Sequence, residues 1–196
     1  MRRIFIIRHG NTFASSVDAR RVGSRTDIPL VESGLAQADR LGVWFADQVP
    51  RIGRLLCSPL LRARETADRV AAATGRPIDG VRDWLGEIDH GPDEGRPEAD
   101  VAARIGAKAL ADWDERAIAP DGWIVDADTR IAAWRAFFAD GHGGVDLLVT
   151  SNGAARFALL AANLPLGAMK LRTGAFGELA VDDTGGVSLR RWDVRP

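Results

Sequence analysis

Short apolar runs alternate with longer amphipathic stretches along this chain. Residues 4–7 (Ile-Phe-Ile-Ile), 54–57 (Arg-Leu-Leu-Cys) and 145–150 (Val-Asp-Leu-Leu-Val-Thr) have the length and apolar character of buried strands. Apolar side chains recur at helical spacing over about 33–47, 59–74, 98–116, 128–139 and 152–162. Strands that alternate with helices predict a mostly parallel sheet with helices on both faces.

Local signals set the boundaries of the second helix. Ser58 is a favoured N-cap and Pro59 a favoured first helical residue, and Gly75 is expected to end the helix after Thr74. The apolar stripe expected to pack inward consists of Leu61, Thr66, Val70 and Ala73.

Weaker patterns predict the edges of the sheet. Residues 77–81 are expected to form an edge strand, since Pro77 fits an edge better than a sheet centre. From Gly177 to Val194 the pattern alternates around a turn at residues 183–186, which predicts a hairpin that adds an antiparallel strand. Asn163 and Pro165 are expected to close the helix that follows the strand at 145–150.

We expect residues 1–196 to form a single domain, because no linker-like stretch divides them. Residues 13–30 lack periodicity and predict a surface loop beside the end of the first strand. Residues 88–128 are interpreted as an insertion that covers, like a lid, the carboxyl edge of the sheet.

Composition narrows the function classes. The 196 residues are 46% hydrophobic and 27% charged, as in ordinary globular proteins, and the formal net charge is −1. This balance gives no general electrostatic attraction to nucleic acid or to an anionic membrane. The single cysteine, Cys57, cannot form an internal disulfide, no apolar run approaches a membrane span, and no signal peptide is evident; the cytoplasm is therefore expected.

Polar residues that suit phosphate chemistry follow the predicted strands. Arg8 and His9 end the first strand, Arg62 stands in the first turn of a helix, and Asn152 and Gly153 follow the strand at 145–150. The carboxyl ends of parallel strands share one edge, where ligands bind in open α/β sheets. A short Arg-His-Gly taken alone is also compatible with a paired arginine and a loop histidine. The convergence of several segments favours a site.

The acid- and glycine-rich loop 84–95 brings Glu87 toward the same edge. Two arginines around a histidine suit a dianionic phosphoryl group and bias the imidazole to its neutral, nucleophilic form. A carboxylic acid can protonate a leaving alkoxide and later activate water. This set suffices for phosphoryl transfer through a phosphohistidine without a metal, and the three histidines and one cysteine show no metal-ligand spacing.

The motifs resemble those of the histidine phosphatase superfamily, also called phosphoglycerate mutase-like. The resemblance covers most of the chain in the family's order. It rests on Ile7-Arg8-His9-Gly10-Asn11-Thr12, on Thr26-Asp27-Ile28-Pro29-Leu30 with Gly34-Leu35-Ala36-Gln37-Ala38, on Ser58-Pro59-Leu60-Leu61-Arg62-Ala63-Arg64-Glu65-Thr66-Ala67, on Leu85-Gly86-Glu87-Ile88-Asp89-His90-Gly91 closing on Glu94-Gly95, and on the strand at 145–150 with its turn.

The resemblance implies a three-layer α/β/α sandwich around a six-stranded, mostly parallel sheet with one antiparallel strand. It implies that His9 is the phosphorylated nucleophile, that Arg8 and Arg62 hold phosphoryl oxygens, and that Glu87 is the proton donor and then the base. No cofactor is implied, and the partner is a small phosphorylated substrate or phosphate. We expect the phosphate site to be completed by Asn11, Asn152 and Gly153.

Three positions depart from the family pattern. The second histidine that usually precedes the glycine of the last block is replaced by Asn152, which can donate a hydrogen bond but carries no positive charge. Gly122-Trp123-Ile124 stands where many members have Gly-Glu-Ser, and Ser15 stands where phosphoglycerate mutases usually have asparagine. Loss of one charge-assisted donor commonly costs about 10²–10³ in rate, so weak phosphatase activity is expected.

The sequence leaves several alternatives open. A phosphomonoesterase is favoured over a degenerate protein that binds a phosphate ester without turnover, and both over a phosphoglycerate mutase. His90 is interpreted as a loop histidine that contacts a neighbouring carbonyl rather than as a substitute for the missing histidine. Trp113 and Trp123 are compatible with a stacking wall or, as is more usual, with core. Substrate identity and oligomeric state have no signal in the sequence.

Overall fold

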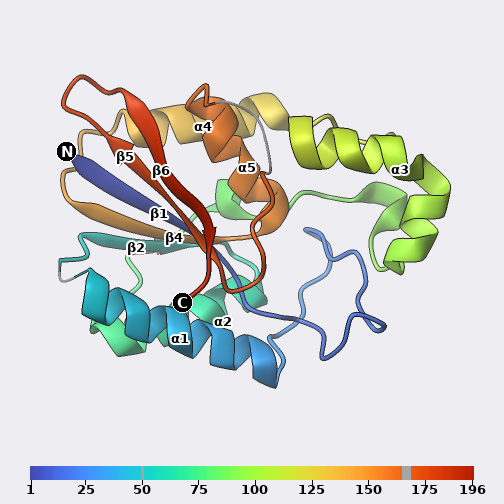
Figure 1. The fold of residues 1–196 in the computed structure, drawn as a ribbon, viewed down its shortest axis with the longest axis horizontal. Coiled ribbons are helices and arrows are strands. Elements are labelled where there is room, and N and C mark those ends of the chain that lie inside the picture. The colour runs from blue at the N-terminus through green and yellow to red at the C-terminus, as the bar shows by residue number, and fades with distance from the viewer. Residues whose placement is uncertain (50, 165–168) are drawn as a thin grey trace.

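A six-stranded sheet forms the centre of the protein (Figure 1). A computed structural model describes residues 1–49, 51–164 and 169–196. The strands stand in the order β3-β2-β4-β1-β5-β6. Their bounds are Arg2–Arg8 for β1, Arg54–Cys57 for β2, Gly80–Val81 for β3, Val145–Thr150 for β4, Phe176–Val181 for β5 and Val187–Val194 for β6.

Four neighbouring strands are parallel and the C-terminal hairpin is not. β3, β2, β4 and β1 pair in parallel, whereas β5 runs antiparallel to β1 and to β6. The mixed sheet with one reversed strand is therefore confirmed. Arg8 is in register with Thr150, so the segments that follow β1 and β4 leave the sheet side by side.

Helices cover both faces of the sheet (Figure 1). Helices α1 (Glu32–Gln48) and α2 (Leu61–Thr74) lie on one face, and α4 (Ala127–Phe138) and α5 (Asn152–Ala161) on the other. Helix α3 (Glu98–Arg116) extends beyond the carboxyl edge of the sheet and is kinked at Gly106, whose φ is 82°. The expected α/β/α sandwich is confirmed.

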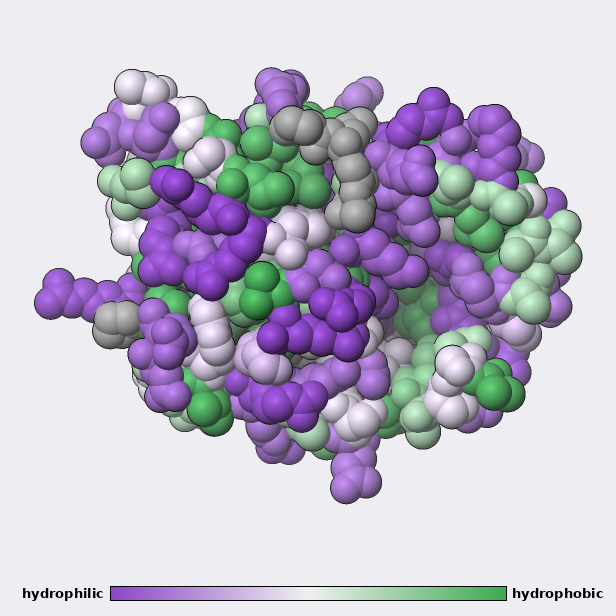
Figure 2. Space-filling model, viewed as in Figure 1, coloured by the Kyte–Doolittle hydropathy of each residue, from purple (hydrophilic) through white to green (hydrophobic). Residues whose placement is uncertain are grey.

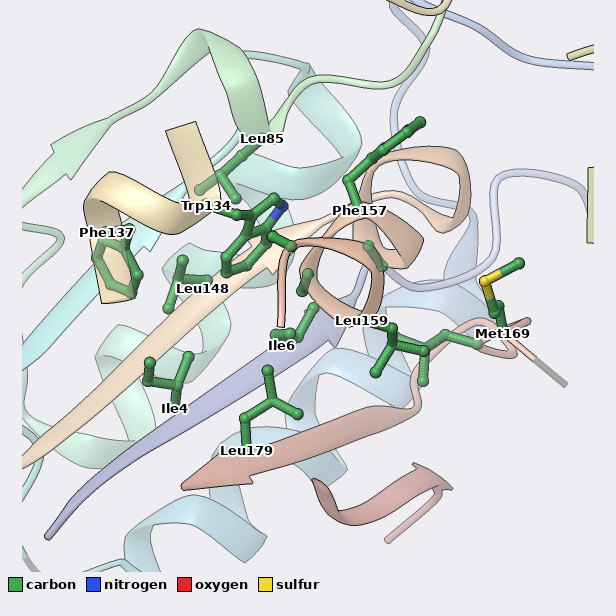
Figure 3. Close-up of a cluster of buried hydrophobic side chains, with 14 of the residues drawn as sticks. Ile4, Ile6, Leu85, Trp134, Phe137, Leu148, Phe157, Leu159, Met169 and Leu179 are labelled. Atoms are coloured by element: carbon green, nitrogen blue, oxygen red, sulfur yellow. The ribbon is translucent and has the colours of Figure 1, made fainter. Parts of the chain in front are cut away.

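The strands bury apolar side chains on both faces, which explains their continuous apolar runs. Phe5, Ile7, Leu147 and Val149 pack toward α1 and α2 in one cluster. The opposite cluster contains Ile4, Ile6 and Leu148 from the strands, with Trp134 and Phe157 from α4 and α5 (Figure 3). The two layers fix the strand ends from which the polar site residues project.

The expected start of α2 is wrong. The helix begins at Leu61, and the Ser58 hydroxyl accepts a hydrogen bond from the Leu60 N–H instead of capping a helical turn. The Leu61 N–H donates to Asp27 Oδ1 at 2.6 Å, so a distant loop carboxylate satisfies the first turn. Leu61 and Ala73 are exposed rather than packed inward, whereas Thr66 and Val70 are buried as expected.

Other boundaries agree with the sequence to within a few residues. Gly75 ends α2 in the left-handed conformation, at φ 68°. The edge strand β3 is present but spans only Gly80–Val81. Pro165, expected to help close α5, lies outside the described residues. No helix in the described part of the chain is both long enough and apolar enough to cross a membrane.

Candidate active site

A cleft of about 650 Å³ opens at the carboxyl edge of the parallel strands. The space-filling view shows the surface hollowed between the part over α3 and the rest of the molecule (Figure 2). Segments from distant parts of the chain meet there because β1 and β4 are central neighbours. The expected site residues that line the cleft are Arg8, His9, Asn11, Glu87, Asn152 and Gly153.

Both ring nitrogens of His9 have partners in the protein, a backbone carbonyl oxygen for one and an arginine for the other. Nδ1 lies 2.8 Å from the carbonyl oxygen of Gly10, and Nε2 lies 3.3 Å from Nε of Arg62, which can only donate. These partners assign the proton to Nδ1 and the lone pair to Nε2. Burial, followed by the charges of Arg62 and Arg8, holds the pKa of His9 well below its usual 6.5. The imidazole is therefore neutral and nucleophilic at Nε2.

Arg62 is brought to His9 by the loop that precedes α1. Its side chain is buried, and its terminal nitrogens donate to the carbonyl oxygens of Thr26 at 2.8 Å and Gly23 at 3.1 Å. Loop 13–30 therefore serves as the clamp for this guanidinium. Burial lowers the pKa of Arg62, and the charges of Glu87 and Asp27 oppose that effect.

Arg8 is fixed from the opposite side. Its Nη1 donates to the carbonyl oxygen of Leu171 at 2.6 Å, while its Nε is buried with no partner among the described residues. Burial lowers the pKa of Arg8 to about 10, so the side chain stays cationic at neutral pH. An unpaired buried donor beside a nucleophilic imidazole is a feature of an anion site.

Glu87 is held by two backbone N–H groups. Ile88 donates to Oε1 at 3.0 Å and Gly153 donates to Oε2 at 3.1 Å. Burial acts to raise the pKa of Glu87, but His90, the two N–H groups and Arg62 together lower it. The carboxyl group is therefore ionised at neutral pH.

The loop that carries Glu87 is fixed by a residue that the sequence did not single out. Arg130 of α4 donates to the carbonyl oxygens of Gly86 at 2.7 Å and Glu87 at 3.3 Å. An arginine at a helix start is usually solvated, so the pattern gave no signal for this role.

The remaining expected phosphate contacts have partners within the protein. The side-chain oxygen of Asn152 accepts a hydrogen bond from the Leu171 N–H at 2.9 Å. The Asn11 amide donates to Ser33 Oγ at 3.2 Å and accepts from the Thr173 hydroxyl. The Gly153 N–H is committed to Glu87 in this structure. The N-terminal end of α5 thus holds the site's carboxylate.

A buried arginine lies behind the wall of the cleft. Arg156 is fully buried, its guanidinium lies 3.9 Å from the Trp113 ring centroid, and it donates to the Trp113 carbonyl oxygen. Burial lowers its pKa to about 10. It lies four residues after Asn152 on the same helix face, and this spacing alone does not distinguish it from a solvated helix arginine. Trp113, which is 2% exposed, belongs to the core and lines the cleft as well.

The segment at residues 122–124, which departs from the family pattern, contributes Trp123 to the hydrophobic core. Trp123 is buried and donates its indole N–H to Asp93 Oδ2 at 2.7 Å, and Ile124 is 65% exposed. Asp93 is fully buried and also pairs with Arg104. Within the described ranges, no group of three or more histidine, cysteine or carboxylate side chains is placed to hold a metal ion.

The chain matches the model of a known protein family over nearly its whole length. The model of the histidine phosphatase superfamily (branch 1) matches residues 4–193, which include every expected site residue. The chain belongs to the histidine phosphatase superfamily. The matched residues include the motif around His9 and nearly all of the six-stranded sheet.

Curated members of the histidine phosphatase superfamily resemble part of the chain. A 2,3-bisphosphoglycerate-dependent phosphoglycerate mutase from Clavibacter sepedonicus is 30% identical over 129 residues, 65% of this chain and 51% of the relative. A Yersinia pestis protein named "Probable phosphoglycerate mutase GpmB" is 27% identical over 146 residues, 62% of this chain and 66% of the relative. The matched region thus spans about half to two thirds of these relatives.

Solved structures are similar over the whole fold. A mycobacterial glucosyl-3-phosphoglycerate phosphatase superposes with a TM-score of 0.83 at 24% identity and covers 100% of both chains, and it has also been solved with inorganic phosphate. An alpha-ribazole phosphatase from Shigella flexneri gives a TM-score of 0.75 at 25% identity, over 98% of this chain and 96% of that one. The similarity to the mycobacterial phosphatase concerns the fold alone.

Proposed function

We propose that this protein is a phosphomonoesterase that acts through a phosphohistidine on His9. The observation that carries the proposal is the unprotonated Nε2 of a buried, neutral imidazole placed beside Arg8 and Arg62. Two guanidinium groups around one nucleophile match the charge of a phosphoryl dianion.

In the first step, Nε2 of His9 forms a bond to phosphorus while the phosphorus–oxygen bond to the alcohol breaks. The alcohol leaves with a proton supplied by Glu87. In the second step, Glu87 takes a proton from water, the resulting hydroxide attacks phosphorus, and the bond to Nε2 breaks to release inorganic phosphate. Arg8 and Arg62 neutralise the oxygens of the phosphoryl group throughout.

Glu87 is ionised before substrate binds and therefore needs a proton to act as an acid. A phosphoryl dianion in the cleft disfavours the neighbouring carboxylate and raises its pKa. Substrate binding thus favours the protonated form of Glu87, which can act as the general acid.

The substrate class is a small phosphorylated metabolite, and residues 88–128 act as the lid over it. Glu98, Trp113 and Asp114 of α3 line the cleft opposite the strand ends, which supports this role. A chain with one buried free thiol, Cys57, suits the reducing cytoplasm.

Asn152 favours a second candidate function, a protein that binds a phosphate ester without turning it over. No positive charge stands where the family usually has its second histidine, so hydrolysis is expected to be slower than in members that retain it. A phosphoglycerate mutase is the weaker candidate and rests on the names of the curated relatives.

Rapid quenching with a ³²P-labelled phosphate ester tests the proposal. We expect a phosphoryl group on the protein that is labile to acid and stable to base, and we expect it to be absent in His9→Ala. Turnover of p-nitrophenyl phosphate with excess chelator tests whether a metal is needed. If His9→Ala keeps the wild-type rate, His9 is not the nucleophile; if wild type binds phosphate but never turns over, the binding function is correct.

A further inference from the structure

Two backbone carbonyl oxygens of a loop orient the guanidinium of Arg62. They belong to Thr26 and Gly23, which accept hydrogen bonds from its terminal nitrogens and lie outside the helices and strands of the described chain. The third guanidinium nitrogen, Nε, faces Nε2 of His9. The position of this cation beside His9 is therefore only as well defined as the loop that holds it.

The side chain of Glu94 contacts both of these loop residues. Its Oε1 accepts a hydrogen bond from the Thr26 hydroxyl at 2.8 Å. Its Oε2 lies against Gly23, where a Cβ would stand only 2.5 Å from that oxygen. The Glu94 side chain is 5% exposed, so it packs inside the protein rather than in solvent. One buried carboxylate thus touches the two residues whose carbonyl groups hold Arg62.

The missing side chain at Gly23 permits this packing. A Cβ there would also stand 2.8 Å from Nδ1 of His90, so the buried ring of His90 lies against the same backbone. Neither ring nitrogen of His90 makes the expected contact with a neighbouring carbonyl as a hydrogen bond in the described chain. The ring packs edge-on against Trp123 instead, with the ring centroids 4.5 Å apart.

Backbone hydrogen bonds bring the two loops together on either side of this contact. The Ser24 N–H donates to the carbonyl oxygen of Ile88 at 2.9 Å. The Gly95 N–H donates to the carbonyl oxygen of Arg21 at 2.7 Å, and the Arg21 N–H donates to that of Arg96 at 2.9 Å. The segment that begins with Glu87 is therefore bound along its length to the loop that holds Arg62.

Glu94 also affects the charge of Arg62. Burial lowers the pKa of this guanidinium, and the negative charges of Glu87, Asp27 and Glu94 oppose that effect. A hydroxyl that donates to an ionised carboxylate makes a stronger hydrogen bond than one that donates to a neutral oxygen. The contact between Thr26 and Glu94 is therefore suited to fix the backbone at position 26.

We propose that Glu94 is a positioning residue for phosphoryl transfer, which acts through Thr26 and Gly23 to orient Arg62 toward His9 and the phosphoryl group. The inference rests on the proposed function, since it requires that the cleft bind a phosphoryl group. Residues 87–94 then have two roles, because Glu87 is the general acid and Glu94 fixes a phosphate-binding arginine. Without this contact Arg62 samples more positions and binds phosphate less well.

Binding of inorganic phosphate to the full-length protein, measured by isothermal titration calorimetry, tests this role. Thr26→Val removes the hydroxyl without changing the charge of the cleft. We expect its Kd for phosphate to rise about fivefold, the typical effect of one lost hydrogen bond. Thr26→Ser keeps the hydroxyl and should retain most of the affinity. Ser24→Ala removes an exposed hydroxyl from the same loop and is the matched control.

A double-mutant cycle with Arg62→Gln separates positioning from general damage to the cleft. If Thr26 acts through Arg62, Thr26→Val should cause no further loss of phosphate affinity in the Arg62→Gln background. Equal losses in both backgrounds would mean that Thr26 supports the fold of the cleft and does not position Arg62.

Hydrogen exchange at the Nε–H group of Arg62, followed by nuclear magnetic resonance, gives a measurement that does not depend on phosphate. The group is buried and faces His9, so exchange in wild type should be slow. We expect about tenfold faster exchange in Thr26→Val and in Glu94→Ala, because both variants loosen the loop locally. Glu94→Gln keeps an acceptor oxygen for Thr26 and should retain slow exchange.

The inference is wrong if exchange at Arg62 is unchanged in both Thr26→Val and Glu94→Ala, or if phosphate affinity is unchanged in Thr26→Val, while thermal melting shows that the variants fold. The proposed function stands in either case. If His9→Ala retains full turnover, the proposed function fails, and exchange at Arg62 still decides whether Glu94 holds this arginine.

Discussion

The backbone of Gly153 contacts the Glu87 carboxylate so closely that a side chain at position 153 would not fit. The Gly153 N–H donates to Glu87 Oε2 at 3.1 Å, and a Cβ on Gly153 would stand 2.1 Å from Oε1 and 3.0 Å from Cδ of the same carboxyl group. Only a glycine permits this approach. The carboxylate is therefore positioned by the first turn of α5, the helix that also carries Asn152.

Replacing Gly153 by alanine should displace Glu87. We expect kcat on an alkyl phosphate to fall by about 10²-fold, within the range typical of a lost general acid. Gly143→Ala is the matched control, because a Cβ there meets nothing within 4 Å. The positioning role is wrong if Gly153→Ala leaves kcat unchanged while thermal melting shows that it folds.

Glu87→Gln should discriminate between leaving groups. An alkoxide needs its proton in the transition state, whereas p-nitrophenolate does not. We therefore expect a loss of about 10²-fold on alkyl phosphates and a much smaller loss on p-nitrophenyl phosphate, measured as kcat under saturating substrate. Equal losses on both substrates would assign Glu87 a structural role only.

The buried neutral His90 should make folding stability depend on pH. Its folded pKa is about 4, and the ordinary value in an unfolded chain is 6.5. As pH falls below 6.5, His90 becomes protonated in the unfolded chain but stays neutral in the folded protein. The free energy of unfolding therefore decreases toward pH 4. At pH 5 the penalty is about 2 kcal/mol.

Urea unfolding of wild type and His90→Gln at pH 7.5 and pH 5 measures that penalty. The glutamine variant lacks the titrating ring, so its stability relative to wild type should improve by about 2 kcal/mol between the two pH values. His142→Gln should show no such relative change. A constant difference between wild type and His90→Gln would mean that His90 titrates normally in the folded protein.

The sequence was sufficient to predict the sheet and to bring the candidate site residues to one edge of it. Continuous apolar runs predicted β1, β2 and β4, and the parallel arrangement placed the residues after them at one edge. The pattern of apolar and polar residues does not predict contacts between loops. The N–H of Leu61 is satisfied by Asp27, 34 residues earlier, so the helix start could not be found from local capping signals.

The same limit applies within the site. The Glu94 and His90 side chains pack closely against Gly23, about seventy residues away in sequence, and the periodicity of the chain does not predict this contact between loops. The buried Arg156 has the sequence context of an ordinary helix arginine. Its fixed position appears only once α3 and Trp113 are packed over it.

Asn152 provides the last prediction, because it separates a weakened enzyme from a binding protein. Its side-chain oxygen is engaged by the Leu171 N–H, which orients the amide at the edge of the cleft. Asn152→His should restore a strong donor to the phosphoryl group and raise kcat by up to about 10²-fold, if one lost charge-assisted donor is the whole deficit. Steady-state kinetics of wild type and Asn152→His measure this effect. If Asn152→His lowers a wild-type rate near 10 per second, Asn152 is a working part of an efficient phosphatase and the idea of a deficit is wrong. If turnover stays at background while phosphate affinity changes, the protein is a phosphate-ester binder.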